Sequence, residues 1–374
     1  MKEKSCWDAT QHSWSKRPIR RRLATSLLLN FSPALQPGLI FIQLGYYQYN
    51  MNKNSNGMKT LFSGIKPTGQ LHLGNYLGAI KNWVDLQKKY DCIYSVVDLH
   101  ALTIDIDAAT LRKNTRELAV DLLALGINPK KSILCKQSEV TGHTELDWIF
   151  NCLIPVAELE RMTQYKDMCV RQPKNVNAGL LTYPALMAAD ILIYGAEYVP
   201  VGEDQLQHLE LTRVLARKFN NKYKKYFAEI QPILSKNIRV MSLNAPNKKM
   251  SKSLGETSYI AIRDNAATIT KKIKKAVADE AGVKNLLELY KIFGETTKYK
   301  KFNRDLAKKQ LMNSTLKDEL TKSVLKFLKP VQKKIKYYDA HPLEVEKILS
   351  DGAKKAQVLA DKNLLEIKKL VGLI

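Results

Sequence analysis

The stretch "SGIKPTGQLHLGNYLGA", residues 63–79, predicts a strand that passes through a glycine-rich turn into a helix. The apolar run "KTLFSGI" (59–65) has the length and composition of a buried strand, and the residues after the turn have helical spacing. At such a junction the N-terminus of the helix offers free N–H groups to a phosphate. An ordinary strand-to-helix turn has the same pattern, so the turn alone leaves function open.

The glycines of this turn match neither of the two common phosphate-binding motifs. The segment "GQLHLG" (69–74) has the glycine spacing of a P-loop, but Asn75 and Tyr76 follow where a P-loop requires Lys and then Ser or Thr. The string is also not GxGxxG. His72 and Asn75 can share one helix face and can both donate hydrogen bonds to phosphate oxygens. Gly74 leaves room for a flat base, so the turn suits a nucleotide.

Downstream of this turn, strands and helices alternate. Apolar runs at 92–97, 132–137 and 198–202 are candidate strands, and helical patterns cover 75–90, 108–126, 179–195 and 204–219. This alternation predicts an α/β fold, a parallel sheet with crossover helices. After Arg263 the pattern becomes helical and basic. We therefore predict an α/β domain over 58–264 and a helical domain over 265–374.

The composition favours a polyanionic partner. Sixty Lys and Arg residues face 36 Asp and Glu residues, which gives a net charge of +24 in 374 residues, although a lysine-rich solvated surface would also explain it. No apolar run approaches the roughly 18 residues that a membrane span needs. The five cysteines form no CxxC pair and have no histidine at zinc-ligand spacing. We expect reduced thiols and no structural metal.

Residues 1–57 differ in composition from the rest of the chain. They contain "KRPIRRR", and after Asp8 no acidic residue appears until Asp85. This composition is typical of an organellar transit peptide. An unstructured extension, or a start upstream of the natural one at Met58, would have the same composition. We expect a basic N-terminal extension outside the folded domains.

Two further stretches place acidic residues where a ligand could use them. The segment "GED" (202–204) ends a predicted strand, where carboxylates can accept from ribose hydroxyls, although its aspartate could equally cap the next helix. Tyr183, Met187 and Asp190 line one face of an apolar helix. The Asp190 carboxylate should be buried and should need a donor, either a structural arginine or a ligand N–H.

The segment "KMSKS" (249–253) lies in a loop rich in lysine and serine, after the last predicted strand. A loop of this composition could close over a triphosphate. A solvated surface loop would look the same.

Together, and in this order, these stretches resemble the class I aminoacyl-tRNA synthetases. "HLGN" (72–75) is similar to the HIGH signature, and "KMSKS" matches the second signature of that class. "ELERMTQYK" (158–166), "GLLTYPALMAADIL" (179–192) and "VPVGEDQLQHLELTR" (199–213) look like the bacterial-type tryptophanyl-tRNA synthetases. The resemblance runs from about Met58 to the C-terminus and rests on several independent motifs.

This resemblance implies an activity and a set of partners. The reaction would join ATP and L-tryptophan into tryptophanyl-adenylate and pyrophosphate, and would then transfer the amino acid to tRNA(Trp). Mg²⁺ would accompany the ATP. The resemblance also implies that 58–264 is a Rossmann-like nucleotide-binding catalytic domain with a helical insertion, and that the helical domain over 265–374 binds the anticodon. It further implies a homodimer and a cytoplasmic location, with a mitochondrion or other organelle as the alternative if residues 1–57 are a transit peptide.

The family pattern also implies roles for individual residues. The catalytic residues would be His72, Asn75, Lys249 and Lys252. The ATP-binding residues would be Lys66, Pro67, Thr68, Gly74, Asn75, Gly202, Glu203, Asp204, Val240, Lys249, Met250, Ser251, Lys252 and Ser253. The tryptophan-binding residues would be Asp190 for the indole N–H, Phe62 and Met187 for the ring, and Tyr183, Gln164 and Gln205 for the ammonium end.

Two positions depart from the pattern of the bacterial members. Lys66 stands where many have glutamine, and Met168 stands where many have lysine. We hypothesise that Lys66 supplies a phosphate contact that the missing lysine usually makes.

Three other functions share some of these features. A tyrosyl-tRNA synthetase has the same fold and both signature types, but the "LMAADIL" and "RMTQYK" contexts favour tryptophan. A small-molecule adenylyltransferase would not need a long basic helical region or "KMSKS" at this place. A basic RNA-binding protein on a degenerate synthetase scaffold would not need to keep the acidic and basic residues named above.

Overall fold

The computed structural model describes residues 57–202, 205–234 and 240–374. The predicted extension over 1–57 therefore lies outside the described residues, except for Gly57. Glu203 and Asp204 also lie outside them.

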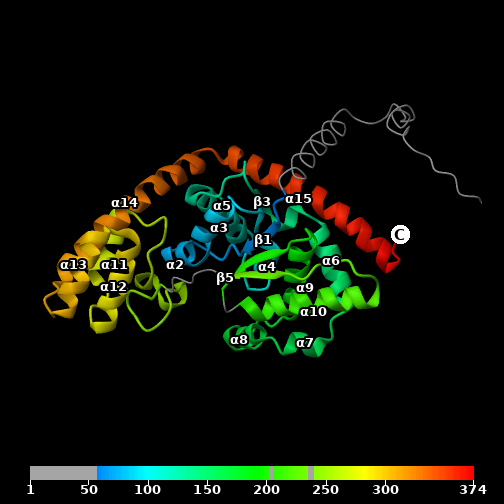
Figure 1. Ribbon diagram of the computed structural model, residues 1–374, viewed down its shortest axis with the longest axis horizontal. Coiled ribbons are helices and arrows are strands. Elements are labelled where there is room, and N and C mark those ends of the chain that lie inside the picture. The colour runs from blue at the N-terminus through cyan, green and yellow to red at the C-terminus, as the bar shows by residue number, and fades with distance from the viewer. Residues whose placement is uncertain (1–56, 203–204, 235–239) are drawn as a thin grey trace, which may run out of the picture. The chain divides into compact units, whose positions relative to one another are not determined.

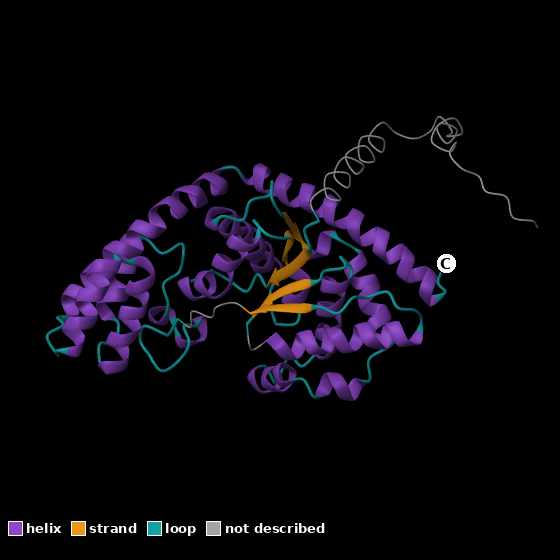
Figure 2. Ribbon diagram, in the orientation of Figure 1, coloured by secondary structure: helices purple, strands orange, loops and turns teal. Residues whose placement is uncertain are grey.

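Five parallel strands form one sheet in the order β3-β2-β1-β4-β5. Figure 2 draws the strands in orange, with the helices in purple around them. The bounds of the strands are β1 Thr60–Ile65, β2 Asp91–Val96, β3 Ile133–Lys136, β4 Tyr198–Val201 and β5 Gln231–Leu234. The predicted parallel α/β fold is confirmed, and four of the five strands coincide with predicted ones. The fifth, β5, was not predicted.

The helical segment after β1 contains an irregular turn. It begins as α2 (Leu73–Asn75), widens into the π-helical η1 (Tyr76–Ile80) and continues as α3 (Lys81–Leu86). Its buried side chains include Leu77, Ile80 and Trp83, which pack in the core with β1 and β2. π-helical turns inside α-helices are often found at functional sites.

The remaining helices of the α/β part are α4 (Asp98–Ala101), α5 (Ala108–Leu125), α6 (Gly142–Asn151), α7 (Val156–Glu160), α8 (Thr163–Arg171), α9 (Ala178–Leu192) and α10 (Leu206–Lys222). Among them, α5, α9 and α10 match predicted helices, and α4, α6, α7 and α8 were not predicted. Asp107 caps α5 by accepting from the Thr110 N–H, and Gly126 ends it with φ 117°. A left-handed residue is a common helix stop, and glycine adopts it without strain.

The C-terminal part is helical, as predicted. It contains α11 (Ala266–Lys275), α12 (Glu280–Phe293), α13 (Thr296–Ala307), α14 (Asn313–Ala340) and α15 (Pro342–Val371). A continuous hydrophobic core joins this part to the sheet, since Leu61 of β1, Leu122 of α5 and Leu320 of α14 belong to one buried cluster. The described residues from Gly57 to Ile374 belong to a single compact unit. A functional division at 264/265 stays a prediction.

The long helix α15 lies against β3, the strand at one edge of the sheet (Figure 1). Gly352 allows this approach, because a Cβ at that position would lie 2.0 Å from the Leu134 carbonyl oxygen. Such a contact leaves no space for a side chain. None of the helices in the described ranges is both long and apolar enough to cross a membrane.

Candidate active site

A pocket of about 440 Å³ opens at the carboxyl ends of β1 and β4. In parallel sheets this edge is where ligands usually bind. Residues from β1, η1, α3, α9 and β4 contribute to its wall. The predicted residues among its lining are Phe62, Lys66, Gln164, Tyr183, Met187, Asp190, Gly202 and Gln205. The structure thus brings all six predicted tryptophan-binding residues to one pocket.

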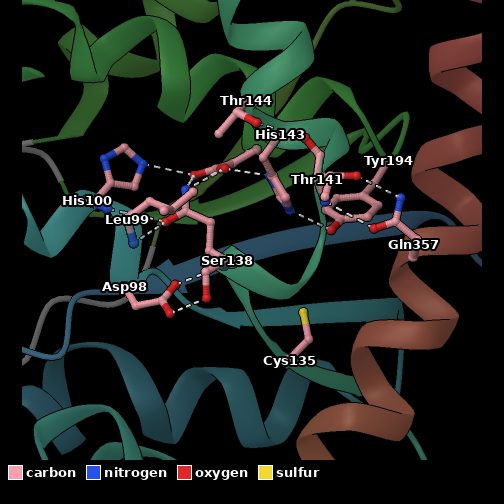
Figure 3. A network of polar contacts seen from close by, with 12 residues as sticks. Asp98, Leu99, His100, Cys135, Ser138, Thr141, His143, Thr144, Tyr194 and Gln357 are labelled. Atoms are coloured by element: carbon pink, nitrogen blue, oxygen red, sulfur yellow. Dashed lines mark hydrogen bonds and ion pairs between the residues drawn. The ribbon is translucent and has the colours of Figure 1, made fainter. Parts of the chain in front are cut away.

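Asp190 is 1% exposed and lies in a buried polar network. Its carboxylate accepts hydrogen bonds from His100 Nε2 at 2.9 Å and from Gln137 Nε2 at 2.8 and 2.9 Å. His143 Nδ1 lies 2.6 Å from Asp190 Oδ1. Figure 3 shows His100 and His143 on opposite sides of this polar network. The donors are therefore two histidines and a glutamine, and no arginine takes part in these contacts.

These partners determine the charge of Asp190. Burial alone would raise the pKa of the carboxyl, but the neighbouring His143 and His100 outweigh burial and lower the pKa to about 2. The network continues outward, because His143 Nε2 lies 2.8 Å from the Tyr194 hydroxyl, and Tyr194 stacks on Phe62 with ring centroids 5.6 Å apart. Asp190 is thus held as an anion beside an aromatic wall of the pocket.

His100, Gln137 and His143 are site residues that the sequence reasoning missed. Each follows a strand end or begins a helix: His100 comes after β2, Gln137 comes directly after β3, and His143 lies in the first turn of α6. The signal available in the sequence was three polar residues next to apolar runs. That signal cannot show that they meet one aspartate on α9.

The pocket lining also contains Tyr183 and Lys66. The Tyr183 hydroxyl lies 2.6 Å from His208 Nε2 and 3.4 Å from Gln164 Oε1. Lys66 Nζ donates to Thr103 Oγ1 at 3.3 Å and lies 5.4 Å from the centroid of the Tyr183 ring. Burial lowers the pKa of Lys66. Met168 lies on α8 and does not line the pocket.

The glycine-rich turn holds His72 at the start of α2. The imidazole is 6% exposed, and its Nδ1 has no hydrogen-bond partner among the described residues. Burial, followed by the charges of Lys252 and Lys249, lowers the pKa of His72 to about 4, so the ring is neutral near pH 7. Asn75 accepts from the His72 N–H through its side-chain oxygen, at 3.1 Å.

The structure gives a second reason for the glycine at position 74. We expected its missing side chain to leave room for a base. A Cβ at Gly74 would lie 2.9 Å from the His72 ring, so glycine is also needed for the position of the imidazole.

The "KMSKS" loop is packed against this turn. Met250 is 2% exposed, and its N–H donates to the carbonyl of Val240 at 2.9 Å. Lys252 Nζ donates to the Thr68 carbonyl at 2.9 Å, and burial lowers the pKa of Lys252. Lys249, by contrast, is exposed. One lysine of the loop already reaches the turn on which His72 lies.

Most of the predicted ATP residues that the structure describes lie on or beside the glycine-rich turn, whereas Lys66 and Gly202 line the pocket. Pro67 is buried beneath the turn, Thr68 faces Lys252, and Ser251 accepts from the Ser253 N–H. The predicted ribose contacts of Glu203 and Asp204 lie outside the described residues. Across the part of the chain that the structure describes, no group of three or more His, Cys, Asp or Glu side chains is arranged to hold a metal ion.

Known proteins are similar to this chain. The family model described as "tRNA synthetases class I (W and Y)" matches residues 53–338. The tryptophan–tRNA ligase of Wolinella succinogenes is 46% identical over 328 residues, covering 84% of this chain and 99% of its own length. That of Helicobacter pylori is 45% identical, with the same coverage.

A solved structure agrees with these relatives. The tryptophanyl-tRNA synthetase of Campylobacter jejuni, complexed with ADP and tryptophan, superposes with a TM-score of 0.75 at 32% identity. The match covers 84% of this chain and 100% of that one. The chain belongs to the class I tRNA synthetases for tryptophan and tyrosine, and it is of the bacterial tryptophan–tRNA ligase type.

Proposed function

We propose that this site activates L-tryptophan with ATP, giving tryptophanyl-adenylate and pyrophosphate, and then transfers the amino acid to tRNA(Trp). The observation that carries the proposal is Asp190, a buried anion in the wall of the pocket. A carboxylate offers about four acceptor positions. His100, His143 and the two contacts of Gln137 occupy them, so a ligand N–H would take the place of one of the Gln137 contacts. A site built around such an N–H rejects ligands that lack it by about 10⁴–10⁵.

The indole would lie between Phe62 and Met187, with its N–H toward Asp190. Phe62 is 3% exposed and is held by Tyr194, so it offers a rigid ring face. Tyr183, Gln164 and Gln205 would address the ammonium end, and all three line the same pocket. The pocket thus combines polar groups with an apolar wall, and tryptophan likewise combines polar groups with an apolar ring.

ATP, as its Mg²⁺ complex, would lie over the glycine-rich turn. His72 and Asn75 would contact its phosphates, and Val240, which is 4% exposed, would support the adenine from below. A neutral His72 can donate to a phosphate oxygen without adding charge. We assign Gly202, Glu203 and Asp204 to the ribose on the family pattern.

The chemistry needs positioning and charge stabilisation. The tryptophan carboxylate is already ionised, so it attacks the α-phosphorus without a strong base, and the bond to pyrophosphate breaks as the new P–O bond forms. Lys249 and Lys252 would stabilise the charge that develops on pyrophosphate. Because Lys252 donates to the Thr68 carbonyl, it would exchange that contact for a phosphate oxygen.

Lys66 would add a positive charge between the two substrates. Its ammonium contacts a hydroxyl and an aromatic ring, which leaves its charge available to a phosphate or a carboxylate. If Lys66 replaces the lysine missing at 168, Lys66→Gln slows tryptophan activation and adding Met168→Lys restores it. Activation by Lys66→Gln at the parent rate would reject this exchange.

We also assign the C-terminal part, 265–374, to anticodon binding, since its helices are basic and come after the "KMSKS" loop in the chain.

We propose a homodimer as well. Trp148 is 71% exposed and Val170 is 81% exposed, and a second copy could cover such apolar side chains. The proposed location is the cytoplasm, with an organelle as the alternative if residues 1–57 act as a transit peptide.

The test is tryptophan-dependent ATP–pyrophosphate exchange by the full chain, with tyrosine as the competing amino acid. We expect exchange with tryptophan only. Exchange with tyrosine, or with neither amino acid, would overturn the proposal. Aminoacylation of tRNA(Trp) then tests the second step, and the 58–374 fragment tests whether the extension is needed.

A further inference from the structure

The segment Tyr259–Asp264 follows the "KMSKS" loop. Its backbone is hydrogen-bonded to the residues immediately before and after His72. The Leu73 N–H donates to the Ile260 carbonyl at 3.0 Å, and the Ile262 N–H donates to the Leu71 carbonyl at 2.9 Å. His72 is paired with Ala261 in an antiparallel bridge between these bonds. The backbone position of His72 therefore depends on this segment.

The side chains of the same segment also reach His72. The Tyr259 ring packs on the imidazole, with centroids 5.5 Å apart and an interplanar angle of 47°. Because His72 Nδ1 has no hydrogen-bond partner among the described residues, this ring contact has a large share in orienting the imidazole.

Lys272 of α11 holds Tyr259 from the helical part of the chain. Its Nζ lies 4.7 Å from the centroid of the Tyr259 ring, a cation–π distance, and 2.7 Å from Asp264 Oδ2. Asp264 Oδ2 in turn accepts from the N–H of Ala261, the residue opposite His72, at 2.8 Å. The Lys272 side chain is only 10% exposed, so its charge lies in a defined, largely dry place.

We propose that Tyr259 and Lys272 are positioning residues that fix the imidazole of His72 for the nucleotide and connect it to helix α11. The proposal rests on the assignment of His72 to ATP given above. Two routes run from Lys272 to His72, one through the Tyr259 ring and one through Asp264 and Ala261. A displacement of α11 would therefore reach His72 directly.

The expected loss of activity follows from how closely the reacting groups must be positioned. A displacement of about 1 Å in a reacting constellation can slow an enzyme about 100-fold. Tyr259 and Lys272 do not line the pocket that holds the six predicted tryptophan residues. Their loss should lower kcat or raise the KM for ATP, and should leave the KM for tryptophan nearly unchanged.

The experiment compares full-length variants in tryptophan-dependent ATP–pyrophosphate exchange, below the lowest Tm of the set. Tyr259→Leu removes the ring, and Lys272→Met removes the charge while keeping most of the side-chain length. We expect each to lower kcat/KM for ATP about 10- to 100-fold, with the KM for tryptophan within about twofold. Tyr259→Phe and Lys272→Arg keep the ring and the charge and should retain most of the activity.

A matched control is Lys291→Met. Lys291 Nζ lies 5.8 Å from the Tyr299 ring, on helices remote in sequence from the turn, and should have no effect on ATP kinetics. Parental kinetics in both Tyr259→Leu and Lys272→Met would overturn the inference, and so would equal losses for ATP and tryptophan. Failure of the wild-type chain to catalyse the exchange would instead overturn the proposed function. If Tyr259→Leu does not fold, Lys272→Met and its arginine counterpart decide.

Discussion

Replacing Asp190 with asparagine removes the charge at the centre of the pocket and keeps the shape of the side chain. We expect two separate effects. The chain should lose stability, because His100, His143 and Gln137 lose an anionic partner. Tryptophan should bind more weakly, because the amide presents an N–H₂ group where the carboxylate presented an acceptor.

The size of the first effect follows from the pKa of Asp190. The pKa falls from its ordinary 3.8 to about 2 in the fold. At 1.36 kcal/mol per pKa unit, the ionised form is favoured by about 2–3 kcal/mol. Leaving a buried donor unsatisfied costs about 1–3 kcal/mol, which agrees with the value obtained from the pKa. Loss of a charged hydrogen bond to the indole should raise the KM for tryptophan about 10- to 100-fold.

The assays are urea unfolding at pH 7 and pyrophosphate exchange as a function of tryptophan concentration. We expect Asp190→Asn to lower the free energy of unfolding by about 2–3 kcal/mol. A change below about 0.5 kcal/mol would refute the reasoning, because that is the size of an ordinary surface substitution. A KM for ATP that rises as much as the KM for tryptophan would refute the assignment to the indole.

Asp147 of α6 provides a matched control with the opposite sign. Burial, followed by the charge of Asp190, raises the pKa of Asp147 from 3.8 to about 7. Its ionisation therefore opposes folding, and the wild type should lose this part of its stability as pH rises from about 4 to 7. Asp147→Asn should stabilise the chain at pH 8 and be neutral below pH 4. The Asp190 contribution is complete above pH 3.8 and is lost only as pH falls through about 2.

Three further predictions concern the turn, the loop and the sheet edge. Lys252→Met, like Lys249→Met, should slow adenylate formation about 100-fold in single-turnover assays while tryptophan binding stays unchanged. Equal losses in the rate of adenylate formation and in tryptophan affinity would mean that the loop has only a structural role. Because the pKa of His72 is about 4, the ring stays neutral above that pH, so His72→Asn should leave the shape of the kcat/KM profile between pH 6 and 8 unchanged. Gly352→Ala should lower Tm, because overpacking against β3 costs about 1–3 kcal/mol or more, which exceeds the gain in helix propensity of about 1 kcal/mol. The control Gly78→Ala should not lower Tm, because a Cβ at Gly78 meets open space.

Local patterns in the sequence predicted most of the fold. The strand, turn and helix at 63–79 were readable because glycine spacing and apolar period act over a few residues. The strand β5 was missed, since it has four residues, contains Pro232 and is exposed at Gln231 and Leu234. The π-helical turn at Tyr76–Ile80 was also missed, because it has no sequence signal of its own.

The candidate site was predictable as a set of residues and less so as a set of contacts. The helical period placed Tyr183, Met187 and Asp190 on one face, and the structure brings all three to the pocket. Burial of the Asp190 carboxylate was predicted and is confirmed. Its partners lie 47 to 90 residues earlier in the chain, and no local pattern relates residues so far apart.

The contact between α15 and β3 has a consequence for the order in which the chain is made. An uncovered edge strand can pair with strands of other chains. The strand β3 is complete at Lys136, whereas α15 begins at Pro342 and is synthesised after every other element that the structure describes. During translation the sheet edge is thus open for most of the time that the ribosome spends on this chain. The 30-residue helix α15 can cover β3 only after it has been synthesised. A chain truncated before α15 would therefore be prone to aggregation even if its active site were complete.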